Sequence, residues 1–191
     1  MSHPEQMNFM RSMKSKFPLH FDNTRILEVG SLNINGSFRE LVDNSRQYIG
    51  IDVGPGPGVD VVVPGQNYDG SSNYFDIVVS TECFEHNPYW LETFFNMIRM
   101  CRPGGLVLMS CATTDRPEHG TSRTSPRDSP LTLQKGWDYY RNLTEKDFLS
   151  HCIPGLHFSE HAFSVNNNGN IWANDLYFYG LKHDTDIRIA S

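Results

Sequence analysis

The sequence lacks a long apolar run. Its apolar stretches, such as Leu106-Val107-Leu108-Met109, are far shorter than the ~20 residues that cross a bilayer, and no charged-then-apolar leader precedes them. We therefore expect no membrane span and no targeting segment. Cysteine is also scarce. The four cysteines have no CxxC spacing, which argues against a zinc site or a disulfide framework and favours a reducing cytoplasm.

An excess of basic residues is absent too. The chain has 16 Lys and Arg against 22 Asp and Glu, a formal net charge of -6. Sequence-independent nucleic-acid binding relies on cations that neutralise phosphates, so we expect no nucleic-acid partner. The scattered histidines show no pairing typical of metal ligands, and the sequence predicts no metal site. A small-molecule substrate is the remaining expectation.

Two apolar segments organise the chain, whose 191 residues we expect to form one domain over 1–191. Residues 25–30 are apolar without alternation, which is typical of a parallel strand covered on both faces. They end at Gly30, where the backbone can turn beneath a ligand. Residues 47–52 end in Asp52, about 20 residues further on, where nucleotide-binding folds place an acid against ribose hydroxyls.

The remaining elements follow from periodicity and turn residues. Methionines recur at helical spacing, so residues 1–20 are expected to carry an amphipathic helix. Further strands are predicted at 59–63, 75–80, 105–111, 156–165 and 171–181, with an asparagine-rich turn at 166–170 between the last two. Helices are predicted at 37–44, after Asn87-Pro88, and after a capping box that begins at Thr144. The helix after Asn87-Pro88 is expected to bury Leu91, Phe94, Phe95, Ile98 and Cys101.

A polar stretch at 113–141 is too long for a simple connection in a compact domain. Such stretches are usually functional, so we predict a lid or substrate loop. It carries five Arg and Lys against four Asp and Glu, and this near neutrality predicts no basic patch.

Five motifs occur in a characteristic order: Glu28-Val29-Gly30, Gly50-Ile51-Asp52, Phe75-Asp76-Ile77-Val78-Val79-Ser80, Glu85-His86 and Arg102-Pro103-Gly104-Gly105-Leu106. In order and spacing they resemble the class I S-adenosylmethionine-dependent methyltransferases, especially the type 11 small-molecule group. The resemblance implies an α/β fold, a Rossmann-like three-layer sandwich whose mostly parallel seven-stranded sheet has one antiparallel strand near its C-terminal end. It also implies S-adenosylmethionine as the cofactor.

The first two strand ends carry the main cofactor-binding candidates. Asp52 offers two acceptor oxygens to a ribose diol. The resemblance places Glu28 and Gly30 beneath the methionine part of the cofactor, where the carboxylate of Glu28 favours positive charge. Backbone donors around Ser31 would receive the cofactor's carboxylate, and Val53 would pack on the adenine.

The resemblance adds four further cofactor-binding candidates. Ser80 and Thr81, at the end of the fourth predicted strand, are expected to line the cleft. The family often places an aspartate after the third strand, against the adenine amino group. Gly65 occupies that region here, so Gln66 or Asn67 is expected to substitute.

The loop after the first strand departs from the family pattern. Leu32 and Ile34 stand where the family's loop usually carries glycines, and the next glycine is delayed to Gly36. The loop must therefore take a longer path. No helix is expected between the second and third strands either, because prolines and glycines fill 54–58.

Methyl transfer is an in-line displacement on an activated sulfonium, which chiefly needs alignment and exclusion of water. A general base is required only if the acceptor keeps its proton near pH 7. Imidazoles titrate in that range, so His86 and His119 are the candidate bases, with helix capping or packing as their alternative roles. Tyr140, beside the predicted lid, is a third candidate for the catalytic site.

The sequence thus favours methyl transfer from S-adenosylmethionine to an oxygen or nitrogen of a small-molecule acceptor. Two alternatives stay open. One is a nicotinamide-dependent oxidoreductase on a related fold, although the GxGxxG turn is missing. The other is a catalytically silent cofactor-binding relative, which the altered loop at Leu32 and Ile34 allows. The acceptor and the oligomeric state do not follow from the sequence.

Overall fold

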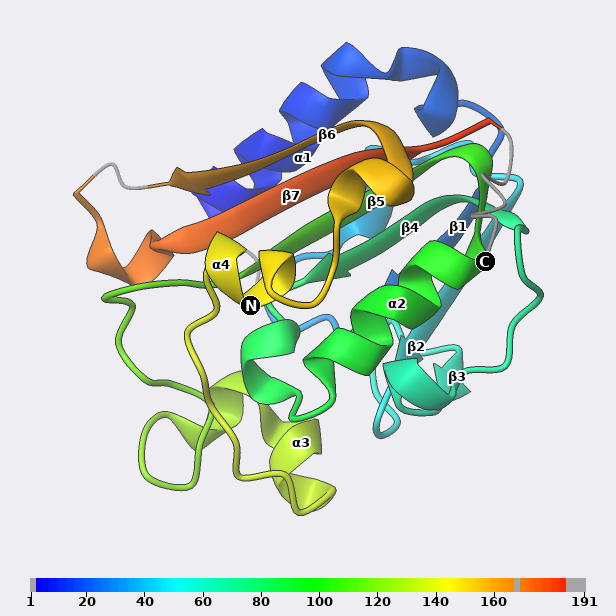
Figure 1. The fold of residues 1–191 in the computed structure, drawn as a ribbon. Coiled ribbons are helices and arrows are strands. Elements are labelled where there is room, and N and C mark those ends of the chain that lie inside the picture. Colours follow the sequence, from blue (N-terminus) through cyan, green and yellow to red (C-terminus); the bar gives the residue numbers. More distant parts are fainter. Residues whose placement is uncertain (1–2, 167–168, 185–191) are drawn as a thin grey trace.

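Seven strands form one sheet, in the order β3-β2-β1-β4-β5-β7-β6 (Figure 1). The computed structural model describes residues 3–166 and 169–184. The strands are β1 (Arg25–Val29), β2 (Gln47–Asp52), β3 (Val61–Val62), β4 (Phe75–Thr81), β5 (Cys101–Ala112), β6 (Phe158–Asn166) and β7 (Asp175–Lys182). β7 pairs antiparallel with both β5 and β6, whereas the other neighbours are parallel. The predicted sheet with one reversed strand is confirmed.

Helices cover both faces of the sheet. They are α1 (Pro4–Lys16), α2 (Trp90–Met100), α3 (Pro130–Gln134) and α4 (Glu145–Leu149). Figure 1 shows α1 on one face and α2 on the other, with α3 beyond one end of the strands. None of these helices is long and apolar enough to span a membrane, as judged over the residues that the structure describes.

The two apolar faces explain why the central strands are apolar without alternation. Ile26 of β1 and Ile77 of β4 belong to a cluster with the buried methionines of α1. Leu27 and Val78, one position further along, belong to the opposite cluster with α2. Successive side chains in a strand point to opposite faces, so both sets must be apolar. The predicted N-terminal helix is therefore part of the core.

Two predicted elements on the β2 side are shorter than expected. The helix expected at 37–44 is a single 3-10 turn, Phe38–Leu41, which begins with a capping box between Ser37 and Glu40. Polar residues that favour turns follow it, so the helix does not continue. The strand expected at 59–63 keeps only Val61–Val62, because the Asp60 carboxylate accepts the hydrogen bond of the Gly50 N–H at 2.7 Å.

Helix α2 begins at Trp90, later than Asn87-Pro88 implied, and its buried face differs from the expected one. The Asn87 carboxamide accepts from the Tyr89 N–H in the turn that precedes the helix. From Trp90 the inward stripe runs through Phe94, Met97 and Ile98, whereas Phe95 is 36% exposed. The expectation that Phe95 lies in the core is wrong: successive residues of a helix are about 100° apart, so Phe95 lies on the solvent side of the stripe that Trp90, Phe94 and Met97 form.

The C-terminal hairpin is longer in its connection than predicted. A 3-10 turn at Ile171–Ala173 follows the asparagine-rich segment, so β7 begins at Asp175 instead of 171. Residues 167–168 of the predicted turn lie outside the described residues. The capping box of α4 is as expected: the Asp147 carboxylate accepts from the Thr144 N–H at 2.8 Å.

Candidate functional site

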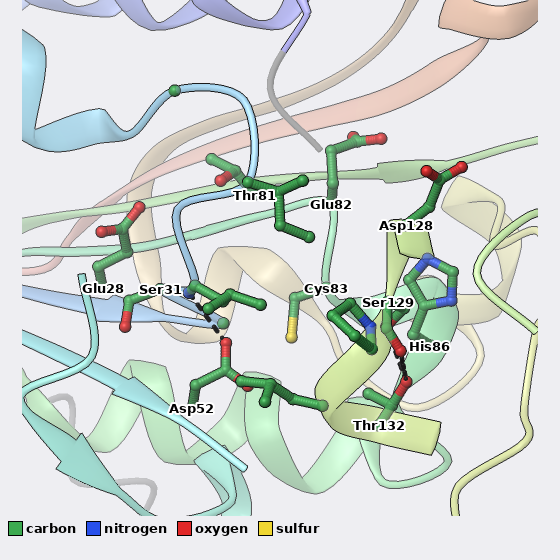
Figure 2. Close-up of a pocket in the computed structure, with 16 residues that line it drawn as sticks. Glu28, Ser31, Asp52, Thr81, Glu82, Cys83, His86, Asp128, Ser129 and Thr132 are labelled. Carbon is green, nitrogen blue, oxygen red and sulfur yellow. Dashed lines mark hydrogen bonds between the residues drawn. The ribbon is translucent and has the colours of Figure 1, made fainter. Parts of the chain in front are cut away.

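A cleft that opens to solvent lies at the carboxyl ends of β1, β2 and β4 (Figure 2). Ligands of open α/β sheets bind at this edge. The cleft is lined by Glu28, Gly30, Ser31, Leu32, Ile34, Gly36, Asp52, Thr81, Glu82, Cys83, His86, Asp128, Ser129, Pro130, Leu131 and Thr132. Six of the residues chosen from the sequence therefore meet here: Glu28, Gly30, Ser31, Asp52, Thr81 and His86.

Asp52 is the acid at the end of β2. One carboxylate oxygen accepts from the Leu32 N–H at 3.0 Å and the other from the Val53 N–H at 2.7 Å. Burial raises the pKa of this carboxyl, and the two N–H groups oppose that rise. A carboxylate has about four lone-pair sites, so each oxygen keeps acceptor capacity for a further donor in the cleft.

The turn after β1 depends on Gly30, whose φ is +78°, a conformation that favours glycine. A Cβ at this position would meet the Cys83 side chain at 2.6 Å. The N–H groups of Gly30 and Ser31 both donate to the Ile51 carbonyl, at 2.9 and 3.1 Å. The loop thus stays tied to β2, and the Ser31 hydroxyl has no hydrogen-bond partner among the described residues.

Glu28 is buried at the other end of the cleft. Its Oε2 accepts from the Tyr48 hydroxyl at 2.7 Å and from the Ser37 hydroxyl at 3.4 Å. Burial raises the pKa of Glu28 to about 7, although both hydroxyls favour the ionised form. Glu28 therefore changes charge in the physiological range.

A second hollow adjoins the cleft and shares Gly30, Asp52, Cys83 and Thr132 with it. Its remaining lining residues are Val29, Ile51, Val53, Gly65, Asn87 and Trp137. Val53 lies in the largely apolar wall of this hollow, so an aromatic group in the hollow would pack against it.

Gln66 and Asn67 line neither hollow. They lie in a 3-10 turn, Gly65–Asn67, where the Gln66 carboxamide oxygen accepts from the Thr93 hydroxyl at 3.3 Å. Gly65 itself faces the second hollow, and a Cβ there would meet Val29 and Thr93 at 2.7 Å.

The two residues at the end of β4 differ in access. The Ser80 hydroxyl is fully buried and donates to the Val29 carbonyl at 2.8 Å, so it joins β4 to β1 and does not line the cleft. Thr81, the next residue, points into the cleft. Cys83, which the sequence reasoning missed, lines both hollows. Its position two residues past the end of β4 indicates this location, because ligands bind beyond the carboxyl ends of parallel strands.

The structure gathers the three candidate catalytic residues. The ring centroids of His86 and His119 are 5.0 Å apart, and that of Tyr140 lies 5.6 Å from His86 and 5.1 Å from His119. The Pro117 carbonyl holds this arrangement, accepting from the Tyr140 hydroxyl and from His119 Nδ1, both at 3.1 Å. Of the three, only His86 lines the cleft.

Burial keeps both imidazoles of this cluster neutral. It lowers the pKa of His86 to about 3, with the nearby His119 acting in the same direction. The pKa of His119 is lowered mainly by burial as well. At pH 7 each ring therefore has one nitrogen with a free lone pair.

A buried ionic group borders the cleft beside Glu82. The Arg116 guanidinium pairs with Glu82 at 2.5 Å and also with Asp175. His3, at the start of α1, pairs with the other oxygen of Asp175 at 2.5 Å. Burial would raise the pKa of Glu82, but the Arg116 charge holds it below its ordinary value. The two ion pairs of Arg116 do not follow from any local pattern in the sequence.

The polar stretch at 113–141 supplies one wall of the cleft. Asp128 and the first residues of α3 line the cleft. The Leu131 side chain lies against Gly54, and Leu131 is only 6% exposed. This segment thus stands over Asp52, as a lid or substrate loop would, although the individual residues 128–132 were not predicted.

Comparison with protein families gives one match. The model of a methyltransferase domain matches residues 5–151. No curated protein matches the sequence. The family match favours the methyltransferase reading over the oxidoreductase.

Solved structures resemble the fold at low identity. The Burkholderia thailandensis 1,6-didemethyltoxoflavin-N1-methyltransferase, with bound 1,6-didemethyltoxoflavin and S-adenosylhomocysteine, has a TM-score of 0.62 and 17% identity, covering 92% of this chain and 78% of that one. Haemonchus contortus phosphoethanolamine N-methyltransferase 2 with S-adenosyl-L-methionine has a TM-score of 0.60, 16% identity, and coverage of 92% and 52%.

A third structure covers most of both chains. The N-methyltransferase NodS from Bradyrhizobium japonicum WM9 with S-adenosyl-L-homocysteine has a TM-score of 0.58 and 12% identity over 95% of this chain and 89% of that one. These likenesses agree with the α/β fold of the chain. With the family match over residues 5–151, they establish that the chain belongs to the methyltransferase-domain family, the class I S-adenosylmethionine-dependent methyltransferases.

Proposed function

We propose that residues 1–191 act as one domain that binds S-adenosylmethionine and transfers its methyl group to an oxygen or nitrogen of a small-molecule acceptor. The observation that carries the proposal is the position of Asp52. It stands in a cleft at the strand ends, keeps acceptor capacity on both oxygens, and shares that cleft with His86.

The residues of the cleft fit the cofactor. Asp52 can accept from two ribose hydroxyls, because its backbone partners occupy only part of its lone pairs. The unpartnered Ser31 hydroxyl is a donor near the turn at Gly30. Val53 and Trp137 line the adjoining hollow, where a purine would find apolar contacts. Ser80, Gln66 and Asn67 have no direct part in this proposal.

S-adenosylmethionine, when bound, supplies a methyl group on an activated sulfonium. The chain must then orient the acceptor and keep water out. Leu131 and its neighbours over the cleft would exclude water, and Thr81 and Glu82 would form the opposite wall. His86 would accept a hydrogen bond from the acceptor and so orient it, with His119 and Tyr140 fixing its ring. Because burial lowers the pKa of His86 to about 3, the neutral ring is a weak base, and it orients the acceptor without taking its proton at pH 7.

The surroundings of the reaction follow from composition. The net charge of -6 favours a small-molecule substrate over nucleic acid. Cys83, Cys101, Cys111 and Cys152 are free thiols, which supports a reducing cytoplasmic compartment. The neighbours named above as N-methyltransferases support nitrogen as one of the two acceptor atoms.

Incubation of the protein with methyl-labelled S-adenosylmethionine and a metabolite extract tests the proposed activity. Label should move into the small-molecule fraction. A heat-treated extract that is filtered to remove macromolecules should support the same transfer. Label that enters only protein or nucleic acid would contradict the proposed acceptor class.

Cofactor binding is expected to depend on pH through Glu28. Below its pKa of about 7 the buried carboxyl is neutral, and above it the carboxyl is negative. The cofactor carries a positive sulfonium and a positive ammonium, so it favours the ionised form and releases the proton on binding. The affinity for S-adenosylmethionine should therefore rise from pH 5.5 to about 7 and then level off.

Calorimetric titration over this range measures the effect. Glu28→Gln, which cannot ionise, should flatten the pH profile. S-adenosylhomocysteine, which lacks the sulfonium charge, should show a weaker dependence in the wild type. An equally steep profile in Glu28→Gln would assign the titration to another group.

A further inference from the structure

The carboxylate of Glu85 has no partner at all within the described part of the chain. The residue is fully buried, yet neither Oε1 nor Oε2 has a hydrogen bond. An ionised carboxylate in this position is very unfavourable, and a protonated one would leave its O–H without an acceptor. A ligand that pairs with these two oxygens would remove this unfavourable term.

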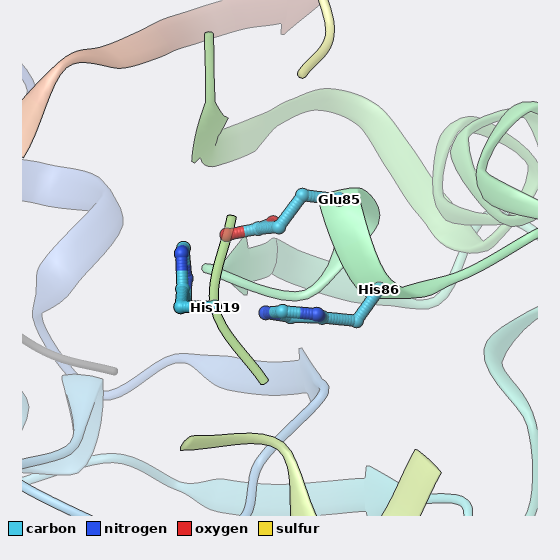
Figure 3. A group of neighbouring side chains, drawn as sticks. All are labelled: Glu85, His86 and His119. Atoms are coloured by element: carbon cyan, nitrogen blue, oxygen red, sulfur yellow. The ribbon is translucent and has the colours of Figure 1, made fainter. Parts of the chain in front are cut away.

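Two imidazoles face the same point, as Figure 3 shows. His119 donates from Nδ1 to the Pro117 carbonyl at 3.1 Å, which leaves the lone pair on Nε2, and Nε2 is buried without a partner. The same pattern, one ring nitrogen bonded to a carbonyl and the other free, is typical of metal-binding histidines. His86 has a buried, unpartnered nitrogen too, Nδ1.

The ligand atoms of Glu85, His86 and His119 all lie within 4.8 Å of one another. Two imidazole nitrogens and one carboxylate oxygen are the donor set of catalytic zinc sites and of several other divalent transition-metal sites. We propose that Glu85, His86 and His119 bind a divalent transition-metal ion such as Zn²⁺. Metal–ligand bonds of about 2.0–2.2 Å would draw the three side chains closer together.

Flanking residues of the chain support this placement. A Cβ at Gly120 would meet the His86 ring at 2.6 Å, so a glycine next to His119 lets the two histidines approach. His86 also lines the open cleft, which gives the ion a path of entry. Three protein ligands leave a coordination position free for water or substrate.

A second group of residues with metal-ligand side chains already contains a cation. His3, Glu82 and Asp175 also lie close enough for one ion. However, the Arg116 guanidinium already pairs with both carboxylates. A cation is therefore already paired within that group, whereas Glu85 forms no ion pair with any residue that the structure describes.

The ion would have two consequences. It would fasten the stretch around His119 to the turn that carries Glu85 and His86. If the proposed methyl transfer is also correct, the free coordination position would hold an acceptor oxygen or nitrogen and promote loss of its proton. His86 and His119 would then serve as ligands, and the proton of the acceptor would pass to solvent water through the open cleft that His86 lines.

Metal binding by the full-length, untagged protein tests the site without any activity assay. Apo protein is titrated with Co²⁺ and with Zn²⁺, and bound metal is measured by visible absorption and by elemental analysis after desalting. The wild type should bind about one ion per chain. Glu85→Gln and His119→Ala should each weaken binding roughly 100-fold or more, because each removes a direct ligand.

His161→Ala serves as the matched control, since this histidine is exposed on β6 and outside the cluster. It should bind metal like the wild type. Glu85→Gln is nearly isosteric, and its circular dichroism and thermal unfolding should match those of the metal-free wild type. The proposal is overturned if the wild type binds far less than one ion, or if both ligand variants bind normally. Loss of binding only in His3→Ala would overturn it as well.

Discussion

Asp52→Ala is expected to weaken the binding of S-adenosylhomocysteine roughly 100-fold or more. Under the proposed function its carboxylate accepts two hydrogen bonds from the ribose. A hydrogen bond to a charged group contributes about 1.5–3 kcal/mol, and about 1.4 kcal/mol corresponds to tenfold in affinity. Asp52→Asn keeps one carbonyl acceptor and should lose less. Isothermal titration calorimetry at pH 8, where Glu28 is ionised, measures both losses.

The Asp52 carboxylate also accepts from Leu32 and Val53, so a general loosening of the loop must be separated from loss of the ribose contact. Asp69→Asn is the control, because Asp69 is an exposed acid that lines neither hollow. It should bind like the wild type. The role of Asp52 would be refuted if Asp52→Ala retained its fold, judged by thermal unfolding, and bound with wild-type affinity.

Arg116→Ala is expected to lower the free energy of unfolding by about 3–5 kcal/mol, since removing one partner of a buried ion pair leaves the other charged and unpaired. Here two carboxylates, Glu82 and Asp175, would lose the Arg116 cation, and His3 would still pair with Asp175. For a chain of this size the midpoint of thermal unfolding should fall by about 10 °C. Calorimetry or circular dichroism measures the shift.

Arg123→Ala is the matched control for Arg116→Ala. Arg123 also pairs with two carboxylates, Glu118 and Asp138, but its side chain is 57% exposed. Exposed pairs contribute about 0–1 kcal/mol, so its midpoint should change by about 3 °C at most. Similar shifts in the two variants would contradict the view that burial gives the Arg116 group its importance.

The sheet could be predicted because its central strands obey one simple constraint. Ile26 and Leu27 face opposite layers, and both layers are apolar, so the strand reads as a continuous apolar run. Asp52 could be predicted because an acid that ends an apolar strand lies at the edge of the sheet, outside the apolar core. These local signals do not depend on the path of the chain elsewhere.

Ser80 shows where local signals fail. It is at a strand end, as predicted, but its hydroxyl donates to the carbonyl of Val29, its partner in the β1–β4 register. The direction of a side chain at a strand end depends on the exact register and on where the strand stops, which a motif does not specify. Thr81, the next residue, lines the cleft, as was expected of both Ser80 and Thr81.

The meeting of His86 and His119 was also beyond the sequence. Nothing periodic links them, because their approach depends on the path of the polar stretch 113–141 that carries His119. That path is set by long-range contacts: the Asn142 side chain donates to the Arg116 carbonyl at 2.9 Å, and the Tyr140 hydroxyl donates to that of Pro117. The near neutrality of the stretch likewise concealed that Arg116 is buried with one partner just after β4 and another on β7.

A crystal structure of the protein with S-adenosylhomocysteine tests the central claim most directly. We expect the ligand in the cleft, with its ribose hydroxyls within hydrogen-bond distance of Asp52, its adenine beside Val53 and its sulfur toward His86. A ligand bound elsewhere, with Asp52 hydrogen-bonded only to Leu32 and Val53, would contradict the proposed cofactor site.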